Sequence, residues 1–358
     1  MELKKYASLV AALASFLTPF MGSAINLAIP SIGKQFGSSA YLLGWVATCY
    51  LLAAAAFLVP LGRLADIRGR KKIFILGLRV FLVSSLFCGS AWSMETLLIF
   101  RVCQGIGGAM IFGTAVAILT SVYPPRERGR MLGLNSAAVY TGLSLGPVLG
   151  GALNHNLGWR SIFYFTALFA IVVLALTITR LKGEWAGARG EKFDLPGAVL
   201  YTVGLIALLT GVSSFTAPGG MKYLLFPGLI ILAEFVKYAV SNVDKPVLDL
   251  KLFAKNMTFA FSNLAALINY SATFAVTFLL SLYLQVVVGY DSQTSLLVSS
   301  AGTWMQMVAQ GWLIYELTGS AFYLELVGLM QAVPRFAFSL FGGAAADRLD
   351  RKRLLCFT

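Results

Sequence analysis

The stretch GRLADIRGRKK, residues 62–72, lies between two long apolar runs and decides which fold we expect. Its single acid, Asp66, lies among five cations, and Gly62 and Gly69 allow tight backbone turns. A carboxylate among guanidinium groups can form a charge-assisted network that holds two helix ends together. Breaking such a network could accompany a conformational switch. The alternative for the cations alone is a basic loop that only sets membrane topology.

The composition indicates a polytopic membrane protein. The 358 residues are 58% hydrophobic and 12% charged, and the mean hydropathy is +0.79. A helix that spans a membrane needs about 20 apolar residues. This composition argues against a soluble enzyme, a nucleic-acid binder and a disulfide-stapled secreted domain. The sequence holds eleven candidate spans, at about 7–30, 40–61, 73–92, 96–121, 132–154, 161–179, 195–215, 223–240, 258–284, 297–317 and 321–345.

Basic residues fall in every second loop between these runs. The loop after the fourth run, for example, holds Arg126, Arg128 and Arg130, whereas the loops on either side are poor in cations. Cytoplasmic loops are enriched in Lys and Arg, so the alternation predicts a cytoplasmic N-terminus. The net charge of +13 therefore indicates a lipid bilayer as partner, and not nucleic acid. The cysteines show no metal or disulfide spacing and His155 is the only histidine, so we expect neither a metal nor a cofactor.

A second stretch, RVCQGIGGAM at residues 101–110, places a charge inside an apolar run. Arg101 lies several residues into the run, and Gln104 follows one helical turn later. An arginine within the membrane is costly unless it is paired or hydrated, which favours a functional role. We expect it to face the interior of a helix bundle, near polar groups such as Asn26 or Gln104. The alternative is an arginine that snorkels to the outer interface, because Glu95 lies only about one turn away.

A third stretch, GLSLGPVLGG at residues 142–151, carries glycine at every fourth position. These glycines share one face of a helix and allow close packing against a neighbour. A proline within the run removes one backbone hydrogen bond and bends the helix. The residues of this stretch that we single out are Gly142, Gly146, Pro147, Gly150 and Gly151.

In this order, the three stretches resemble motifs of the major facilitator superfamily. GRLADIRGRKK is similar to its motif A, RVCQGIGGA to motif B, and GLSLGPVLGG to motif C, the antiporter motif. Other stretches, among them GWRSIFYF at 158–165 and KFDLPGAVLYTVGLIALL at 192–209, resemble the fourteen-helix drug:proton antiporters. This resemblance covers residues 1 to about 293.

The resemblance implies an all-α fold and a function. It implies a six-helix bundle in residues 1–180, a cytoplasmic linker in 181–194, two inserted helices in 195–240 and the first helix of an incomplete C-terminal bundle in 241–293. Two such bundles rock about a midplane site and export lipophilic or cationic small molecules in exchange for protons. The chain is then no enzyme, and we expect a monomer in the prokaryotic inner membrane.

The resemblance also implies roles for single residues. Arg101 with Gln104 takes part in proton coupling, and Asn26 lines the substrate cavity. Gly146 with Pro147 shapes the interface between the bundles. Met21 stands where the family commonly has an acid, so the carboxylate that carries the proton is not identified. The residues that latch the cytoplasmic gate are Gly62, Asp66, Gly69, Arg70 and Lys71.

Residues after about 294 resemble a different subgroup. The segment 302–355 is similar to the first two helices of enterobactin-exporter-like major facilitators and carries a second motif A around Asp347 and Arg348. With a cytoplasmic N-terminus this basic loop would lie outside, against the positive-inside rule. We expect a join of two transporter fragments in 294–358, which would leave the chain alone without proton-coupled transport. The alternative is a natural fusion with altered topology.

Two other functions compete with proton-coupled export. One is a facilitator-type transporter of another solute, such as a siderophore, a sugar or a peptide. The other is a polytopic membrane enzyme, which would need clustered His, Asp or Ser side chains in or near the membrane. The sequence has one histidine and no acidic pair within the spans, which disfavours the enzyme, and motif C favours export over the facilitator.

Overall fold

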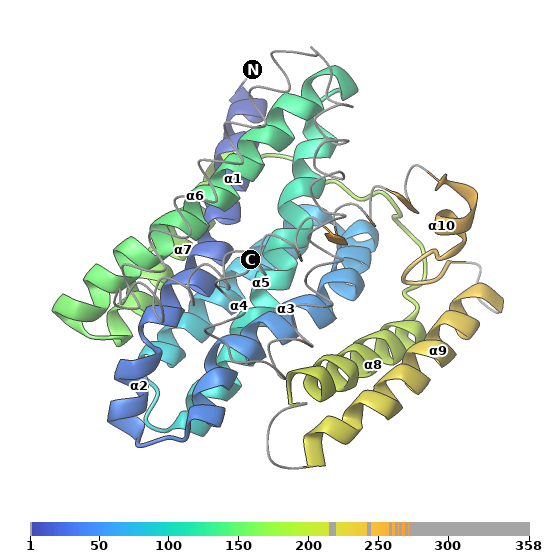
Figure 1. Cartoon of the computed structure of the whole chain (residues 1–358). Helices are drawn as coiled ribbons and strands as arrows, with labels where there is room; N and C mark the ends of the chain where they lie inside the picture. Colours follow the sequence, from blue (N-terminus) through green and yellow to red (C-terminus); the bar gives the residue numbers. More distant parts are fainter. Residues whose placement is uncertain are drawn as a thin grey trace, which may run out of the picture. The chain divides into compact units, whose positions relative to one another are not determined.

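The computed structural model describes residues 2–214, 220–241 and 245–257, with isolated residues as far as Ser271. The chain divides into two compact units, residues 1–250 and 251–358. The described part of the second unit includes one short helix, α10 (Lys251–Lys255). All the site residues predicted from motifs A, B and C lie in the first unit (Figure 1).

The regular structure in the described residues of the first unit is helical. Its helices are α1 (Glu2–Ala24), the 3-10 turn η1 (Ile25–Leu27), α2 (Ile29–Phe36), α3 (Ala40–Arg68), α4 (Arg70–Gly89), α5 (Met94–Val122), α6 (Pro125–Leu157), α7 (Arg160–Arg180), α8 (Leu195–Ser213), the 3-10 turn η2 (Gly220–Leu224) and α9 (Leu225–Ser241).

Eight segments of the described residues are long and apolar enough to cross a membrane. The first comprises α1, η1 and α2 together, and the other seven centre on α3 to α9. They match the first eight predicted spans, so the predicted all-α class is confirmed. The predicted spans at 297–317 and 321–345, and most of the one at 258–284, lie outside the described residues.

The predicted loop at residues 62–72 is wrong. Helix α3 continues to Arg68 and α4 begins at Arg70, so Gly69 alone joins them. A helix forms its backbone hydrogen bonds within itself, so it can continue beyond the apolar layer of the membrane. The apolar run ends at residue 61, but the helix does not end there. Gly69 has φ +118°, a value that residues with a side chain rarely adopt, and it makes the sharp turn possible.

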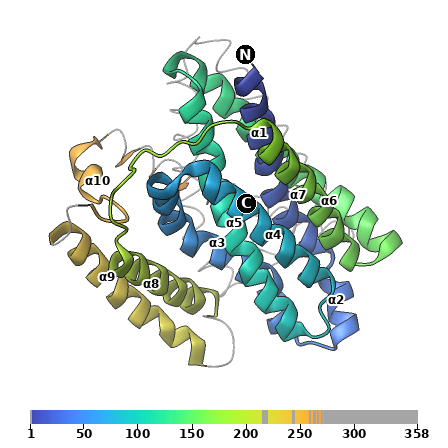
Figure 2. The same ribbon diagram turned by 180° about the vertical axis from the view of Figure 1, so that it is seen from behind.

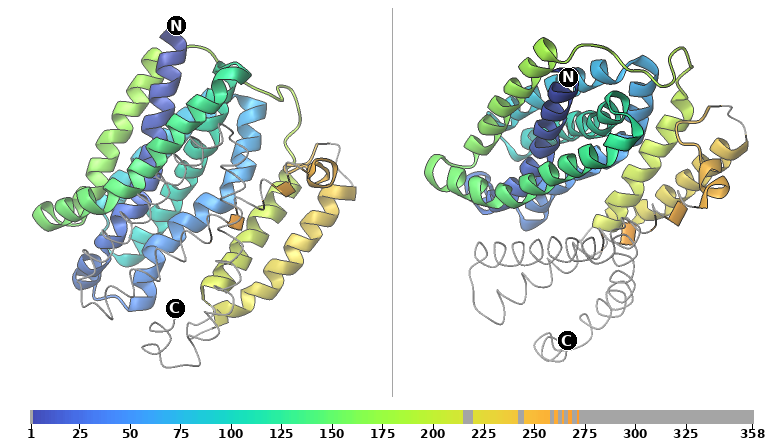
Figure 3. Two further views of the ribbon diagram at one scale, coloured as in Figure 1. Left: turned by 45° about the horizontal axis from the view of Figure 1, so that its top comes forward. Right: turned by 90° about the horizontal axis from the view of Figure 1, so that it is seen from above.

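Helices α1 to α7 pack into one bundle (Figure 3). Helix α1 lies along α6, α5 packs against both α3 and α4, and α7 packs against α4 and α1. The core between them holds large apolar side chains such as Phe20, Phe81 and Phe163, each with no exposed surface. Helices α8 and α9 form a hairpin in which α8 packs against α3.

One end of the bundle is rich in cations. Helix α3 ends and α4 begins where Arg70, Lys71 and Lys72 follow one another, and we call this the basic end. The segment that leaves α7 after Arg180 starts at this end and runs to α8 at Leu195. We call residues 181–194 the linker.

Candidate functional site

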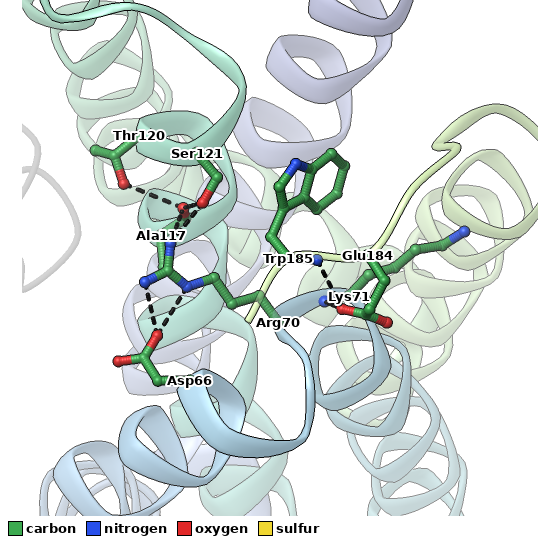
Figure 4. A network of polar contacts seen from close by, with 8 residues as sticks. All are labelled: Asp66, Arg70, Lys71, Ala117, Thr120, Ser121, Glu184 and Trp185. Carbon is green, nitrogen blue, oxygen red and sulfur yellow. Dashed lines mark hydrogen bonds and ion pairs between the residues drawn. The ribbon is translucent and has the colours of Figure 1, made fainter. Parts of the chain in front are cut away.

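At the basic end, Asp66 and Arg70 form an ion pair across the turn between α3 and α4 (Figure 4). Both Nε and Nη2 of Arg70 donate to Oδ1 of Asp66, at 2.8 and 2.7 Å. Nη1 of Arg70 donates to the carbonyl oxygen of Ala117 at 3.0 Å and to the hydroxyl of Ser121. Because Ala117 and Ser121 belong to α5, one guanidinium joins the ends of three helices.

The linker binds to the same turn. The backbone N–H of Arg70 donates to the carbonyl oxygen of Trp185 at 2.7 Å, and that of Lys71 donates to Oε1 of Glu184 at 2.8 Å (Figure 4). The first N–H groups of a helix have no partner within it, so Glu184 serves as a cap for α4. Farther along, the N–H of Ala188 donates to the carbonyl oxygen of Asp66 at 2.9 Å.

Gly69 makes this docking possible. A Cβ atom at this position would overlap the carboxylate of Glu184, and the φ of +118° would be strained in any other residue. Gly62, by contrast, lies within α3, and a Cβ atom there would meet nothing within 4 Å. The structure therefore brings Asp66, Gly69 and Arg70 together with Lys71, but it does not bring Gly62 to this network.

A second carboxylate of the linker bridges two cations. Glu191 accepts from Nη2 of Arg63 and from Nζ of Lys245, each at 2.6 Å. The hydrogen bond from Lys245, with the charges of both cations, holds the pKa of the Glu191 carboxyl below its ordinary value against partial desolvation. A cavity of about 400 Å³ adjoins this bridge and is lined by Val59, Arg63, Asp66, Glu191, Lys245, Pro246, Val247 and Asp249.

The end of the linker is fixed by Asp194, which begins α8. Its carboxylate accepts from the N–H of Gly197 at 2.9 Å, from the hydroxyl of Tyr238 at 3.1 Å and from the N–H of Val247 at 3.2 Å. The linker is thus bound to α3 and α4 at one end and to α8 and α9 at the other. In the described part of the chain, no group of three or more His, Cys, Asp or Glu side chains is placed to hold a metal ion.

Arg101 lies inside the bundle and has no exposed surface. Its Nε donates to the carbonyl oxygen of Val46 at 2.8 Å, and its Nη1 donates to Oε1 of Gln104 at 2.6 Å. Nε2 of Gln104 in turn donates to the hydroxyl of Ser85 at 2.7 Å. The guanidinium also lies over the ring of Tyr50, 4.4 Å from its centroid. The alternative of an arginine snorkelling to the interface is therefore wrong.

The partners of Arg101 are neutral. No carboxylate among the described residues forms an ion pair with it, and its Nη2 is buried without a hydrogen-bond partner. A buried guanidinium that lacks both a counter-ion and one hydrogen bond is costly. Both N–H groups of Nη2 therefore remain available to an acceptor that enters the bundle.

The glycine face at residues 142–150 packs against α1, as we predicted. A Cβ atom at Gly142 would meet the backbone of Phe16, one at Gly146 would meet Ser23, and one at Gly150 would meet Ala24. Each of these three glycines is buried, and so is Pro147, which lies within α6, whereas Gly151 is partly buried. Apolar contact between two spanning helices gains little free energy, because lipid is equally apolar. The glycines instead let the two helices approach closely and gain van der Waals contacts.

Asn26 and Met21 differ in their exposure. Asn26 lies in η1 and is exposed, so of the two polar neighbours that we predicted for Arg101, it is Gln104 that forms the contact. Met21 has no exposed surface, and its sulfur accepts from the hydroxyl of Thr166 at 3.4 Å. The position where an acid was expected thus contacts α7 inside the bundle.

Sequence reasoning missed several partners of these sites. Val46 and Tyr50, which contact Arg101, precede it by about fifty residues and carry no polar pattern that marks them. Glu184 and Trp185 follow motif A by more than a hundred residues. For Glu184 one signal existed, since it is an acid in a linker that starts beside a basic turn.

Two family models match the chain. The model described as Major Facilitator Superfamily matches residues 11–314, and the model described as Transmembrane secretion effector matches residues 293–358. The first covers most of the chain, including every residue of motifs A, B and C. The second begins close to residue 294, where the resemblance of the sequence changes.

Several curated proteins are similar to the chain. The riboflavin transporter RibZ of Clostridioides difficile is 29% identical over 80% of this chain and 62% of its own length. The cephamycin export protein CmcT of Amycolatopsis lactamdurans is 36% identical over 80% of this chain and 60% of its own. The multidrug resistance protein B homolog of Mycobacterium tuberculosis is 31% identical over 94% of this chain and 63% of its own. The chain thus spans less than two thirds of the length of these relatives.

A solved structure shows the same fold. The proton:xylose symporter XylE aligns with a TM-score of 0.54 and 15% identity, over 94% of this chain and 79% of that one. At this identity the likeness concerns the fold alone.

Proposed function

This chain belongs to the major facilitator superfamily, and from that premise we propose that it acts in proton-coupled export of lipophilic or cationic small molecules. Relatives named as an export protein and as a multidrug resistance protein support efflux. The observation that carries the proposal is Arg101, a charge that is fully buried in an apolar bundle and held by neutral partners. An intramembrane charge of this kind marks a functional site by default.

We assign an electrostatic role to Arg101. A guanidinium keeps its proton at all relevant pH values, so Arg101 does not carry the transported proton itself. Its charge sets the potential inside the bundle, where the low dielectric constant makes charges interact strongly. The unpartnered Nη2 then donates to an acceptor that enters the bundle. Through this contact, the conformation of the bundle depends on whether the acceptor is bound.

The basic end is assigned to the cytoplasm, because cations concentrate there. In this orientation the pair of Asp66 and Arg70 latches the cytoplasmic gate, with Glu184 of the linker bound beside it. The groups are partly exposed, and exposed pairs of this kind contribute only about 0.2–1 kcal/mol each. Such a network can hold a conformation and still open during a transport cycle.

The chain is assigned to the prokaryotic inner membrane as a monomer, with protons, a small-molecule substrate and the lipid bilayer as partners. Close packing of Gly142 and Gly146 against α1 supports a rigid N-terminal bundle that moves as a body. A facilitator-type transporter of another solute is the second candidate. It is favoured by the relative named as a riboflavin transporter.

The test is transport by the 358-residue chain reconstituted in liposomes. A pH gradient is imposed, and the movement of a fluorescent lipophilic cation is followed. The join expected in residues 294–358 predicts no proton-coupled transport by the chain alone. The proposal predicts instead gradient-dependent movement that is lost on Asp66→Ala and retained on Glu95→Ala, which removes an exposed acid at the other end of the bundle. Movement that ignores the gradient would favour the facilitator. If the cation does not move although the reconstituted chain is folded, the result would contradict the proposal and support a join of two fragments.

A further inference from the structure

Arg79 lies near the middle of α4 and belongs to none of the three motifs. It follows Arg70 by nine residues and precedes Gly89 by ten. At a rise of 1.5 Å per residue, it is about 14 Å from one end of the helix and about 15 Å from the other. Its side chain is exposed, and no described residue forms a hydrogen bond or an ion pair with it.

The exposed face of α4 points away from the bundle. Lys72, Leu76, Arg79 and Val83 are all exposed and follow one another at intervals of three or four residues, so they form one stripe. The opposite face is buried against α5 and α7. Figure 2 views the bundle from the side on which α4 lies. In a membrane this stripe therefore faces lipid.

A cation at this depth needs a partner. An arginine that faces hydrocarbon is costly, and it lowers the cost by reaching toward the interface. Side chains of a helix point toward its N-terminus, which for α4 is the basic end. Lys72 lies at that end on the same stripe, about 10 Å from Arg79 along the axis. The guanidinium of Arg79, which reaches toward this end, and the ammonium of Lys72 can thus both contact a single group near the interface.

We propose that this stripe is a binding site for an anionic phospholipid of the cytoplasmic leaflet. Lys72 and Arg79 hold its phosphate, and the planar guanidinium can donate two parallel hydrogen bonds to the phosphate oxygens. The stripe carries two cations and no acid, so it matches an anionic headgroup better than a zwitterionic one. Leu76 and Val83, which are 44% and 49% exposed, offer apolar contact to an acyl chain. The leaflet follows from the proposed orientation, whereas lipid binding does not depend on transport.

The test measures lipid retention by the purified full chain. The protein is equilibrated with equal amounts of phosphatidylglycerol and phosphatidylcholine in detergent, and the lipids that remain bound are counted by native mass spectrometry. We expect retention of phosphatidylglycerol in preference to phosphatidylcholine. Arg79→Gln should reduce this preference about fivefold, the factor expected for one cation near an anionic surface. Lys192→Gln, which removes an exposed cation of the linker, should leave it unchanged.

Other outcomes overturn the proposal. Equal retention of the two lipids by the wild-type chain, or an unchanged preference in Arg79→Gln, would exclude a site on this stripe. Stabilisation by inorganic phosphate in phosphatidylcholine nanodiscs would indicate a site for free phosphate instead. A dimer that dissociates on Arg79→Gln would mean that a second copy covers the stripe. If Arg79→Gln does not fold, Lys72→Gln provides the same comparison, because it removes the second cation from an exposed position.

Discussion

Arg70 and Arg101 belong to the same bundle but have opposite surroundings. The side chain of Arg70 is 20% exposed and pairs with the carboxylate of Asp66 at 2.7 Å. Arg101 is fully buried, and the groups bonded to it are a backbone carbonyl, an amide and an aromatic ring. The first arrangement can open at small cost because water replaces each lost contact. The second is costly to disrupt, because no solvent is present to replace its partners.

The glycines around each arginine also differ in what they do. At the basic end, Gly69 provides a backbone angle and space for the linker. Near Arg101, Gly105 and Gly107 bring helix backbones together, since a Cβ atom at either would meet the backbone of a neighbouring helix. Gly69 thus makes room for the linker at the basic end, whereas Gly105 and Gly107 allow close packing of helices near Arg101.

Among substitutions that alter stability, Gly69→Ala should have the largest effect at the basic end. Alanine at φ +118° is strained by about 1–3 kcal/mol, and its Cβ atom would displace Glu184. We expect a lower melting temperature in detergent together with faster trypsin cleavage of the linker. The matched control is Gly62→Ala within α3, where alanine should be neutral or stabilising by up to about 1 kcal/mol. Equal effects of the two substitutions would contradict the assignment of the docking role to Gly69.

Glu184→Ala should have a smaller effect. It removes the cap from the N–H of Lys71, and the loss of a cap costs about 1 kcal/mol. This corresponds to about a fivefold increase in the population of undocked linker. The rate of trypsin cleavage after Arg189 measures it. Glu184→Gln keeps an acceptor oxygen and should lie close to the wild type, whereas an unchanged rate in Glu184→Ala would show that the linker is held elsewhere.

Lowering the pH should have the smallest effect. The pKa of Glu191 is lowered in the folded state, so its bridge to Arg63 and Lys245 stabilises above the ordinary value of 4.5 and is lost as the pH falls through the folded value. Hydrogen exchange of the Ala188 amide, corrected for the intrinsic rate, should quicken below about pH 4.5. Glu191→Gln should quicken the exchange of this amide at neutral pH and remove the stepwise increase in its exchange rate below about pH 4.5. A step that persists in Glu191→Gln would assign the titration to another group.

The sequence predicted the elements better than it predicted their contacts. The buried position of Arg101 and the packing of Gly142 and Gly146 follow from the cost of a charge and from glycine spacing, which are local properties. The turn at Gly69 was predicted as a longer loop. The charged residues of this stretch indicate where the apolar layer ends, but they do not indicate where a helix ends. The docking of Glu184 depends on contacts between residues far apart in the sequence. The hydrophobic periodicity of the sequence does not predict such contacts.

Arg79 shows a different limit of the sequence. It lies within an apolar run, as Arg101 does, yet one is exposed and the other buried. The two differ in the helix face on which they lie, and which face is buried depends on neighbours that the sequence does not name. The same signal therefore belongs to the proposed coupling site in one helix and to the proposed contact with lipid in another.

The most direct test of the central claim is proton movement in liposomes that contain the Arg101→Ala chain. A pH-sensitive dye inside the vesicles reports protons that move when a lipophilic cation is added, and the melting temperature reports folding. We predict that Arg101→Ala abolishes substrate-dependent proton movement while the chain remains folded, and that Arg101→Lys, which keeps the charge but loses the paired donors, restores little of it. Proton movement in folded Arg101→Ala at the wild-type rate would contradict the account.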